Sequence, residues 1–307
     1  MALHGPRPVF DLWIICALHR FVGDWIPIVA THDGPPLAQI TQALNAWPNW
    51  LTGAPIESER PDVGKVLGVG SANTVFSLDR APNFVLRARH NARSMSLNPP
   101  DRELAIWQQA ARLDLAPPVA WASKNSDVVI TSRLHFDRVD DEDHSELLMR
   151  IHESELEAPR LSLEQTAEHY TAAITSKGLT NLAIDFNAQA IRADLRRLDN
   201  ESPCFCHNDL TSSNIGRLEN RYFAIDWEYA ACGSRHFDIA VASQNMERAA
   251  RDHFAERTAG VSFSRPTWQA ACRVERLMDH LWTLAVLGRA EIEQSKEILA
   301  KNWVPHE

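Results

Sequence analysis

The sequence predicts an α+β fold of two lobes, with a small antiparallel sheet lobe placed over a mostly helical lobe. Two observations lead to this prediction. Short apolar and β-branched runs crowd into residues 63–134, with one helical stretch among them. Beyond that region apolar residues recur mainly at helical spacing, interrupted by one compact hairpin. We divide the chain into an N-terminal extension of unknown role (1–36), a small lobe (37–133) and a helical lobe (134–307).

Composition and charge narrow the class of protein. With 307 residues, 45% of them apolar and 23% charged, the chain can bury a sizeable core, as globular enzymes do. The net charge of −9 argues against nucleic acid as a partner and favours a cationic one, although acidity also serves solubility. Four charged or histidine side chains interrupt the apolar residues between Val9 and Ala30, so neither a membrane span nor a signal peptide is expected.

The cysteines indicate a reducing, cytoplasmic location. Five scattered cysteines do not form a disulfide framework. Cys204 and Cys206 stand two positions apart in a strand-like run. Two buried, small apolar side chains explain this pair, and a metal site is the alternative interpretation.

The small lobe is expected to contain two helices around a set of strands. Apolar periodicity and the turn residues between the runs place these elements. The predicted helices are Leu37–Leu51 and Asp101–Leu113; the predicted strands are two runs within 63–78, one at Asn83–Arg89, and a hairpin over 121–134 with its turn at Asn125–Asp127.

The second lobe is expected to be helical on both sides of a hairpin. Helical periodicity returns at His236 after that hairpin. The predicted helices are Glu142–Glu153, Leu163–Lys177, Asn187–Leu198 and the longest, Thr267–Gly288.

The hairpin carries the most informative residues of the chain. His207, Asp209 and Asn214 lie on one short loop, and a strand, a turn at Glu219–Asn220 and a second strand lead to Asp226. The hairpin would bring the acceptor side chains of Asp209, Asn214 and Asp226 to adjoining strand ends. This arrangement suits phosphoryl transfer, which needs a carboxylate near the attacking hydroxyl and oxygen ligands for Mg²⁺.

The pattern H-x-D-x-x-x-x-N followed by I-D-W-E resembles the aminoglycoside phosphotransferase and choline kinase superfamily, closest to the choline kinase and thiamine kinase branch. The resemblance implies a protein-kinase-like fold with ATP between the lobes. It implies Asp209 as catalytic base beside His207, which braces the loop, and Asn214 and Asp226 as Mg²⁺ ligands. Asp238 resembles a family acid that braces the catalytic loop from a helix N-terminus.

Gly68, Gly70, Ser71 and Asn73 form a small-residue turn that is a candidate phosphate-binding loop. Glycines let a backbone approach phosphates closely, but a plain hairpin turn explains them equally well. The form G-S-A-N resembles the corresponding turn of the choline and thiamine kinases. The Walker pattern of the common nucleotide triphosphatases is absent.

Arg87 and Glu103 are candidate residues for holding the nucleotide. The resemblance implies that Arg87 binds phosphate where protein kinases use lysine, and that Glu103 pairs with it. Arg89 competes for this role because it shares the strand face. A plain helix-dipole contact is the alternative role for Glu103.

The substrate residues are less clear from the sequence. Glu228, Tyr229 and Trp282 are candidates: a strand continuing past Asp226 would aim Glu228 at metal or substrate, and W-E-Y is typical of the choline and thiamine kinases. The predicted function is ATP- and Mg²⁺-dependent transfer of a γ-phosphate to choline, ethanolamine or thiamine. An antibiotic (aminoglycoside) phosphotransferase and an inactive kinase-like binding protein are the alternatives. The sequence leaves the oligomeric state open.

Overall fold

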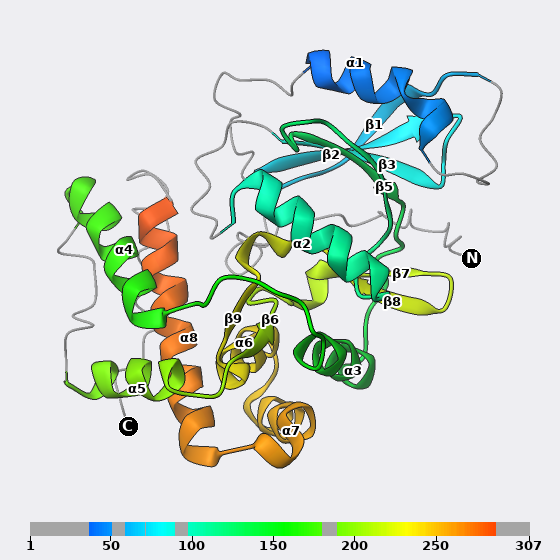
Figure 1. Cartoon of the computed structure of the whole chain (residues 1–307). Coiled ribbons are helices and arrows are strands. Elements are labelled where there is room, and N and C mark those ends of the chain that lie inside the picture. The colour runs from blue at the N-terminus through cyan, green and yellow to red at the C-terminus, as the bar shows by residue number, and fades with distance from the viewer. Residues whose placement is uncertain (1–36, 51–58, 71, 90–97, 180–188, 287–307) are drawn as a thin grey trace, which may run out of the picture.

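A sheet lobe lies above a helical lobe in the computed structural model of the chain (Figure 1). The structure describes residues 37–50, 59–70, 72–89, 98–179 and 189–286. The predicted α+β class and the two-layer order of sheet and helices are confirmed. The predicted extension, residues 1–36, lies outside the described residues.

The small lobe is built on one five-stranded sheet. Its order is β1-β2-β3-β5-β4, and every neighbouring pair is antiparallel. Side chains alternate between its two faces, because successive residues of a strand point in opposite directions. The strands are β1 (Asp62–Val69), β2 (Asn73–Asp79), β3 (Phe84–Arg89), β4 (Val119–Ala122) and β5 (Val128–Ser132).

Helix α1 (Leu37–Asn45) covers one face of this sheet (Figure 1). Its apolar side chains pack with Leu86 and Ile130 in one buried cluster. The predicted helix over Leu37–Leu51 was wrong at its end. The α-helix stops at Asn45 and a 3-10 turn follows at Trp47–Asn49, since Pro48 has no N–H for a helical hydrogen bond.

Helix α2 (Pro100–Arg112) packs on the other side, against the helical lobe. Ile106, Trp107 and Ala110 are its buried apolar residues, and they share a cluster with Val129 of the sheet. The indole N–H of Trp107 donates to the carbonyl of Pro117 over 2.8 Å. The helix therefore bridges the lobes.

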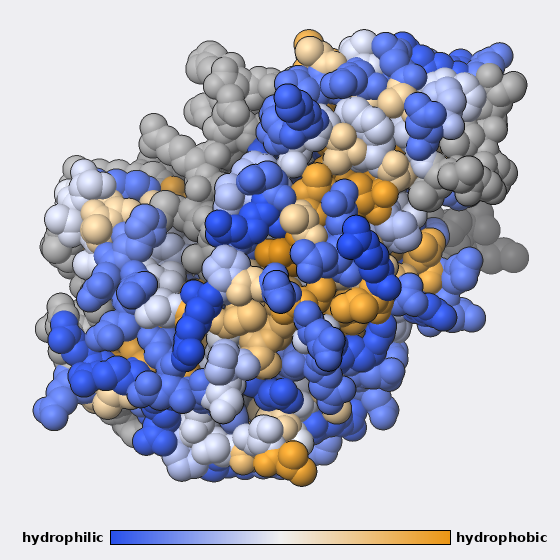
Figure 2. All heavy atoms as spheres, in the orientation of Figure 1, coloured by the Kyte–Doolittle hydropathy of each residue, from blue (hydrophilic) through white to orange (hydrophobic). Residues whose placement is uncertain are grey.

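Residues 133–140 form the linker between β5 and the helical lobe, and a β-hairpin of the helical lobe packs against this linker. The hairpin consists of β7 (Ile215–Leu218) and β8 (Arg221–Ala224), and the linker pairs with it through His135 and Arg217. Gly216 permits this approach, because a Cβ there would lie 2.8 Å from side-chain atoms of Leu134. On the face in Figure 2, apolar side chains gather where the two lobes meet.

The helical lobe forms around α8, which packs against α4, α5 and α6. A short antiparallel pair of strands, β6 and β9, lies beside these helices. Within the described parts of the chain no helix is both long and apolar enough to cross a membrane. The elements are α3 (Asp141–His152), α4 (Leu163–Ser176), α5 (Gln189–Asp199), β6 (Cys204–Cys206), β9 (Ala231–Gly233), α6 (Arg235–Ala242), α7 (Arg248–Ala259) and α8 (Arg265–Val286).

These bounds agree closely with the predicted helices. Helix α3 begins after Asp140, whose carboxylate accepts from the amides of Glu142 and Asp143 as an N-cap. The start predicted for α5 and the end predicted for α8 fall outside the described residues.

Candidate active site

A cleft between the lobes collects residues that are far apart in the sequence. Six of the predicted site residues line it, drawn from the β1–β2 turn, β3 and the two ends of the β7–β8 hairpin. Ser71, the remaining predicted residue of the turn, lies outside the described residues. The six residues are Gly68, Gly70, Asn73, Arg87, Asn214 and Asp226.

The rest of the cleft wall is mainly apolar. Sheet, linker and hairpin each contribute, and Leu134 and Phe136 come from the linker. This apolar wall was not predicted from the sequence. Ile225 was the one residue with a usable signal, because it directly precedes Asp226. The apolar residues are Val69, Ala72, Val75, Val85, Trp107, Pro117, Leu134, Phe136 and Ile225.

The catalytic loop follows β6 and is held by Asp238. One oxygen of this fully buried carboxylate accepts the amide N–H of His207 over 2.9 Å, and the other accepts that of Asn208 over 2.7 Å. Asn208 takes a left-handed conformation (φ 60°), which Asn tolerates better than most residues. Asp238 lies in the first turn of α6, so the predicted bracing geometry is present.

Within the loop, Asp209 and Asn214 are directly linked. The amide group of Asn214 donates to the backbone carbonyl of Asp209 over 2.7 Å and to its carboxylate over 3.0 Å. The NH₂ of Asn214 donates to Asp209, and its amide oxygen is the atom type that a cation binds. Asn214 is buried at the start of β7, and its carbonyl accepts the N–H of Ile225, which brings Asp226 to the same end of the hairpin.

Asp226 lies two residues beyond the second strand in a left-handed conformation (φ 67°), and a 3-10 turn over Trp227–Tyr229 follows. The strand predicted to end at Asp226 stops two residues earlier, and it does not continue to Glu228. Strand β8 ends at Ala224. A left-handed residue breaks the alternation of a strand, so Glu228 does not share a strand face with Asp226.

Arg87 is the cation nearest these carboxylates. Its Nη2 lies 2.6 Å from Oε1 of Glu103 and 3.7 Å from Oδ1 of Asp226. The guanidinium also sits over the ring of Trp107, 5.6 Å from its centroid. Strand alternation puts Arg87 on the cleft face of β3, opposite Leu86, which faces α1.

His207 is buried as a neutral ring. Burial lowers its pKa to about 4, and its Nε2 lies 3.0 Å from the carbonyl of Ile225, to which it donates. The ring contacts Trp227, with centroids 4.6 Å apart. This position suits a brace between the loop and the end of β8 rather than a proton carrier.

Glu228 faces a buried acidic and aromatic region. Burial first, then the charges of Asp226 and Glu103, raise its pKa to about 8. Beside it, the indole N–H of Trp282 donates to the hydroxyl of Tyr229 over 2.9 Å. The 3-10 turn therefore carries two of the predicted substrate residues, Glu228 and Tyr229, and helix α8 carries the third, Trp282.

Tyr170 of α4 belongs to this region and was missed by our sequence analysis. It is 5% exposed, and burial together with the charges of Glu228 and Asp209 raises its pKa. Nothing in its local sequence marked it, because its neighbours in space come from a hairpin distant in the chain.

The residues present fit a magnesium ion. Oδ1 of Asp226 is buried and accepts no hydrogen bond within the described structure, although Arg87 is nearby. Burial raises the pKa of Asp226 more than Arg87 lowers it, so a bound cation would favour the ionised carboxylate. With the amide oxygen of Asn214, this gives two hard oxygen ligands, the number that nucleotide-bound Mg²⁺ commonly takes from a protein.

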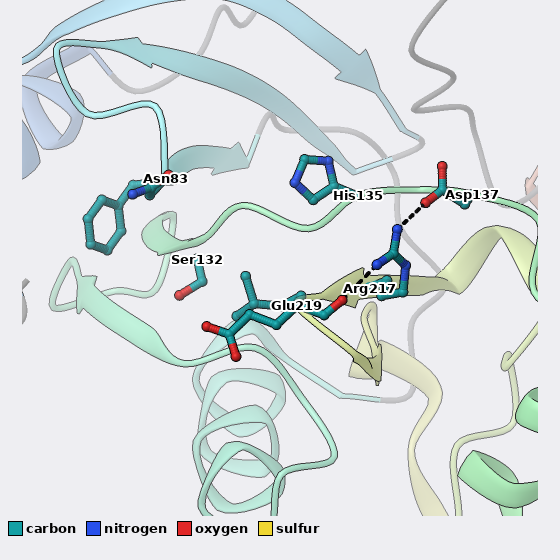
Figure 3. Close-up of a pocket in the computed structure, with 8 residues that line it drawn as sticks. Asn83, Ser132, His135, Asp137, Arg217 and Glu219 are labelled. Atoms are coloured by element: carbon teal, nitrogen blue, oxygen red, sulfur yellow. Dashed lines mark hydrogen bonds and ion pairs between the residues drawn. The ribbon is translucent and has the colours of Figure 1, made fainter.

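A second, more open hollow lies between the linker and the β7–β8 hairpin (Figure 3). There the side chain of Arg217 points to Asp137 and to the carbonyl of Glu219. No predicted site residue lines it, and its polar groups are largely exposed. We therefore assign the chemistry to the cleft instead.

Comparison with known proteins agrees with this geometry. The phosphotransferase enzyme family matches residues 142–272, which include the candidate catalytic loop and the β7–β8 hairpin. The predicted resemblance to the aminoglycoside phosphotransferase and choline kinase superfamily is confirmed. A Mycoplasma capricolum relative, "Protein LicA homolog", is 31% identical over 101 residues. That match spans 32% of this chain and 42% of the relative, so the chain spans less than half of its length.

Solved structures share the fold at low sequence identity. The choline kinase LicA from Streptococcus pneumoniae has a TM-score of 0.60 and 14% identity, over 85% of this chain and 98% of that one. The GDP and kanamycin complex of APH(2")-IIia has a TM-score of 0.63 and 13% identity, over 87% of this chain and all of that one (100%). Both likenesses establish the kinase-like fold.

Proposed function

We propose that this chain is an ATP- and Mg²⁺-dependent phosphotransferase that moves the γ-phosphate to the hydroxyl of a small cationic alcohol. One observation carries the proposal. Asn214 and Asp226 meet Arg87 in a single cleft between the lobes, and Asp209 is hydrogen-bonded to Asn214 at its edge. Phosphoryl transfer requires this set of a base, metal ligands and a phosphate-binding cation.

Each side chain has a distinct role in the proposal. Asp209 orients the substrate hydroxyl and accepts its proton. Arg87 binds phosphate oxygens, and Glu103 fixes its guanidinium. Mg²⁺, held by Asn214 and Asp226, supplies positive charge to the phosphates when it is bound.

The two walls of the cleft suit the two ends of a nucleotide. The apolar wall of Val85, Phe136 and Ile225 would bury a purine ring. The turn with Gly68 and Gly70 would lie over the phosphates. In this orientation the phosphates would lie at the end of the cleft where Asn214, the hydrogen-bond partner of Asp209, is found.

The region around Glu228 supports a single cation as the acceptor. Tyr170 and Tyr229 lie close to the buried Glu228, and Trp282 donates a hydrogen bond to the hydroxyl of Tyr229. A quaternary ammonium group gains about 2 kcal/mol or more from a desolvated aromatic contact. Its positive charge would also favour the ionised form of Glu228, whose pKa is raised in the free chain. We rank choline first, because the name LicA is shared by the curated relative and the pneumococcal choline kinase. Ethanolamine and thiamine follow.

The test is ADP release from the purified chain with ATP and Mg²⁺ over a substrate panel. We expect turnover with choline, ethanolamine or thiamine, and little with kanamycin. Turnover of kanamycin alone would reverse the substrate ranking and favour an antibiotic phosphotransferase, an option that the fold shared with APH(2")-IIia keeps open. Nucleotide binding without turnover on any acceptor would favour an inactive kinase-like binding protein.

A further inference from the structure

A second cluster of ligand-type side chains lies behind the catalytic loop. His152 is the last residue of α3, and Cys204 and Cys206 begin and end β6. One possible ligand atom from each of the three lies within 4.8 Å of the other two. The proposed phosphotransferase chemistry uses none of these side chains.

The spacing of the two sulfurs fits one tetrahedral ion. The Sγ atoms of Cys204 and Cys206 are 3.7 Å apart. Two thiolates bound to a tetrahedral Zn²⁺ at about 2.3 Å lie roughly 3.8 Å from each other. A disulfide fits less well, because residues two apart in a strand have Cα atoms about 6.6 Å apart, near the upper limit for such a bond.

His152 has one ring nitrogen on a carboxylate and, among the described residues, the other without a hydrogen-bond partner. Its Nε2 lies 2.9 Å from Oδ2 of Asp238, to which it donates. Its Nδ1 is then an acceptor, and this atom is buried without a hydrogen-bond partner in the described structure. A carboxylate that orients the outer nitrogen of a ligating histidine is a usual feature of zinc sites.

The cysteines differ in their surroundings. The hydrogen bond from Cys206 lowers the pKa of Cys204 to about 6 against the opposing effect of burial, whereas burial raises the pKa of Cys206 well above its usual value. Cys206 is fully buried, but Cys204 is half-buried, so only Cys206 matches the expectation of buried apolar cysteines. The exposed side of Cys204 gives an ion a route of entry and leaves room for water as a fourth ligand.

We propose that His152, Cys204 and Cys206 bind one thiophilic divalent cation of the Zn²⁺ class, with Asp238 orienting the histidine and water completing the tetrahedron. Each thiol that is still protonated releases its proton to solvent when the ion binds. Asp238 also accepts the amides of His207 and Asn208, so the ion would stiffen the base of the catalytic loop.

The test is titration of the metal-free chain with Cd²⁺ in a thiol-free reductant, following the thiolate-to-metal absorption band. That band reports sulfur ligands, so binding of Cd²⁺ to Asp226 or other oxygen ligands does not contribute. We expect one equivalent of Cd²⁺, displaced by Zn²⁺, with proton release. Cys204→Ser should weaken binding at least about tenfold, and Cys206→Ser should do the same.

Matched variants keep the result interpretable. Cys232→Ser and Cys272→Ser remove described cysteines outside the cluster, and Cys16→Ser removes the one outside the described residues. All three should bind as the unmodified chain does. Circular dichroism and the melting temperature will identify any variant that fails to fold. Cys204→Ser is the decisive variant because the side chain of Cys204 is only half-buried, so its substitution disturbs the core less than that of Cys206. No band in the unmodified chain, or an undiminished band in folded Cys204→Ser, would overturn the site. The assay needs no substrate, so its outcome is independent of the proposed function.

Discussion

Arg87 and Glu103 form a contact of 2.6 Å between β3 and α2, with the glutamate only 4% exposed. Among the described residues, neither has another ion pair as short, although Asp226 lies 3.7 Å from the same guanidinium nitrogen. The pair fixes the position of the Arg87 guanidinium relative to Asp226, the carboxylate proposed to bind Mg²⁺. Its strength therefore affects both folding and nucleotide binding.

We expect Glu103→Gln to destabilise the fold and weaken ATP binding. Breaking a buried ion pair leaves an uncompensated charge, which costs about 3–5 kcal/mol when no partner remains. Since Asp226 remains near Arg87, we expect a smaller loss, about 1–3 kcal/mol, and roughly tenfold weaker ATP binding. Urea unfolding and calorimetry measure the two quantities.

Asp137→Asn is the matched control for that variant. It removes the acid from the exposed Arg217–Asp137 pair, in which the aspartate is 58% exposed. Such surface pairs contribute about 1 kcal/mol or less. Equal effects of the two substitutions on ATP binding would contradict a special role for Glu103.

Asp209→Asn should lower kcat by at least ~10²-fold, the scale of a lost general base. Asparagine can still accept the hydrogen bond from the amide of Asn214, so the fold and the affinity for ATP should be retained. ADP release measures turnover, and calorimetry checks ATP binding in the same preparation. Turnover close to that of the unmodified chain would remove Asp209 from the mechanism.

Asp226→Asn should abolish the tightening of ATP binding by Mg²⁺. Asparagine tolerates the left-handed backbone at this position, so the substitution removes charge with little strain. Calorimetric titration of ATP with and without Mg²⁺ gives the effect directly. Glu228→Gln is the control variant, and it should keep the Mg²⁺ dependence of ATP binding if Glu228 faces the substrate. If Asp226→Asn also keeps this Mg²⁺ dependence, Asp226 has a structural role and does not bind the metal.

Glu228 should make stability fall as pH rises. In the folded chain its pKa is about 8, against 4.5 for an ordinary glutamate, so the folded state holds a proton that the unfolded state has lost. Between about pH 6.5 and 8 this costs about 1.6 kcal/mol, since each pH unit is worth about 1.36 kcal/mol until the folded group begins to ionise near its pKa. Urea unfolding of the unmodified chain and of Glu228→Gln at both pH values measures the difference in slope.

Comparing the unmodified chain with Glu228→Gln isolates the contribution of Glu228 to the pH dependence of stability. The pKa of His207 is lowered from 6.5 to about 4, so this residue makes stability rise with pH up to about 6.5. The pKa of Cys204 is lowered from 9.0 to about 6, so this thiol makes stability rise with pH above about 6. Both contribute equally to the two proteins. If Glu228→Gln has the same pH slope as the unmodified chain, Glu228 is ionised in the folded state.

The local pattern of the sequence determined most of the fold. Alternation and helical spacing depend on neighbouring residues, so β3 and the helices α2 to α4 were predicted within one or two residues of their observed bounds. The loop that carries His207, Asp209 and Asn214, and the hairpin that returns to Asp226, are likewise contained in one continuous segment.

The tertiary structure alone decided which distant residues meet and in what surroundings. Alternation left Arg87 and Arg89 equivalent, and the packing of α2 against β3 brought Glu103 to Arg87. The left-handed turn at Asp226 redirected Glu228 away from the strand face, because a single backbone angle overrides a local pattern. Tyr170 reached Glu228, and His152 reached the two cysteines, only because helices from other parts of the chain pack beside the hairpin. Spacing in the sequence carries no information about such contacts, since they arise from burial of the whole core.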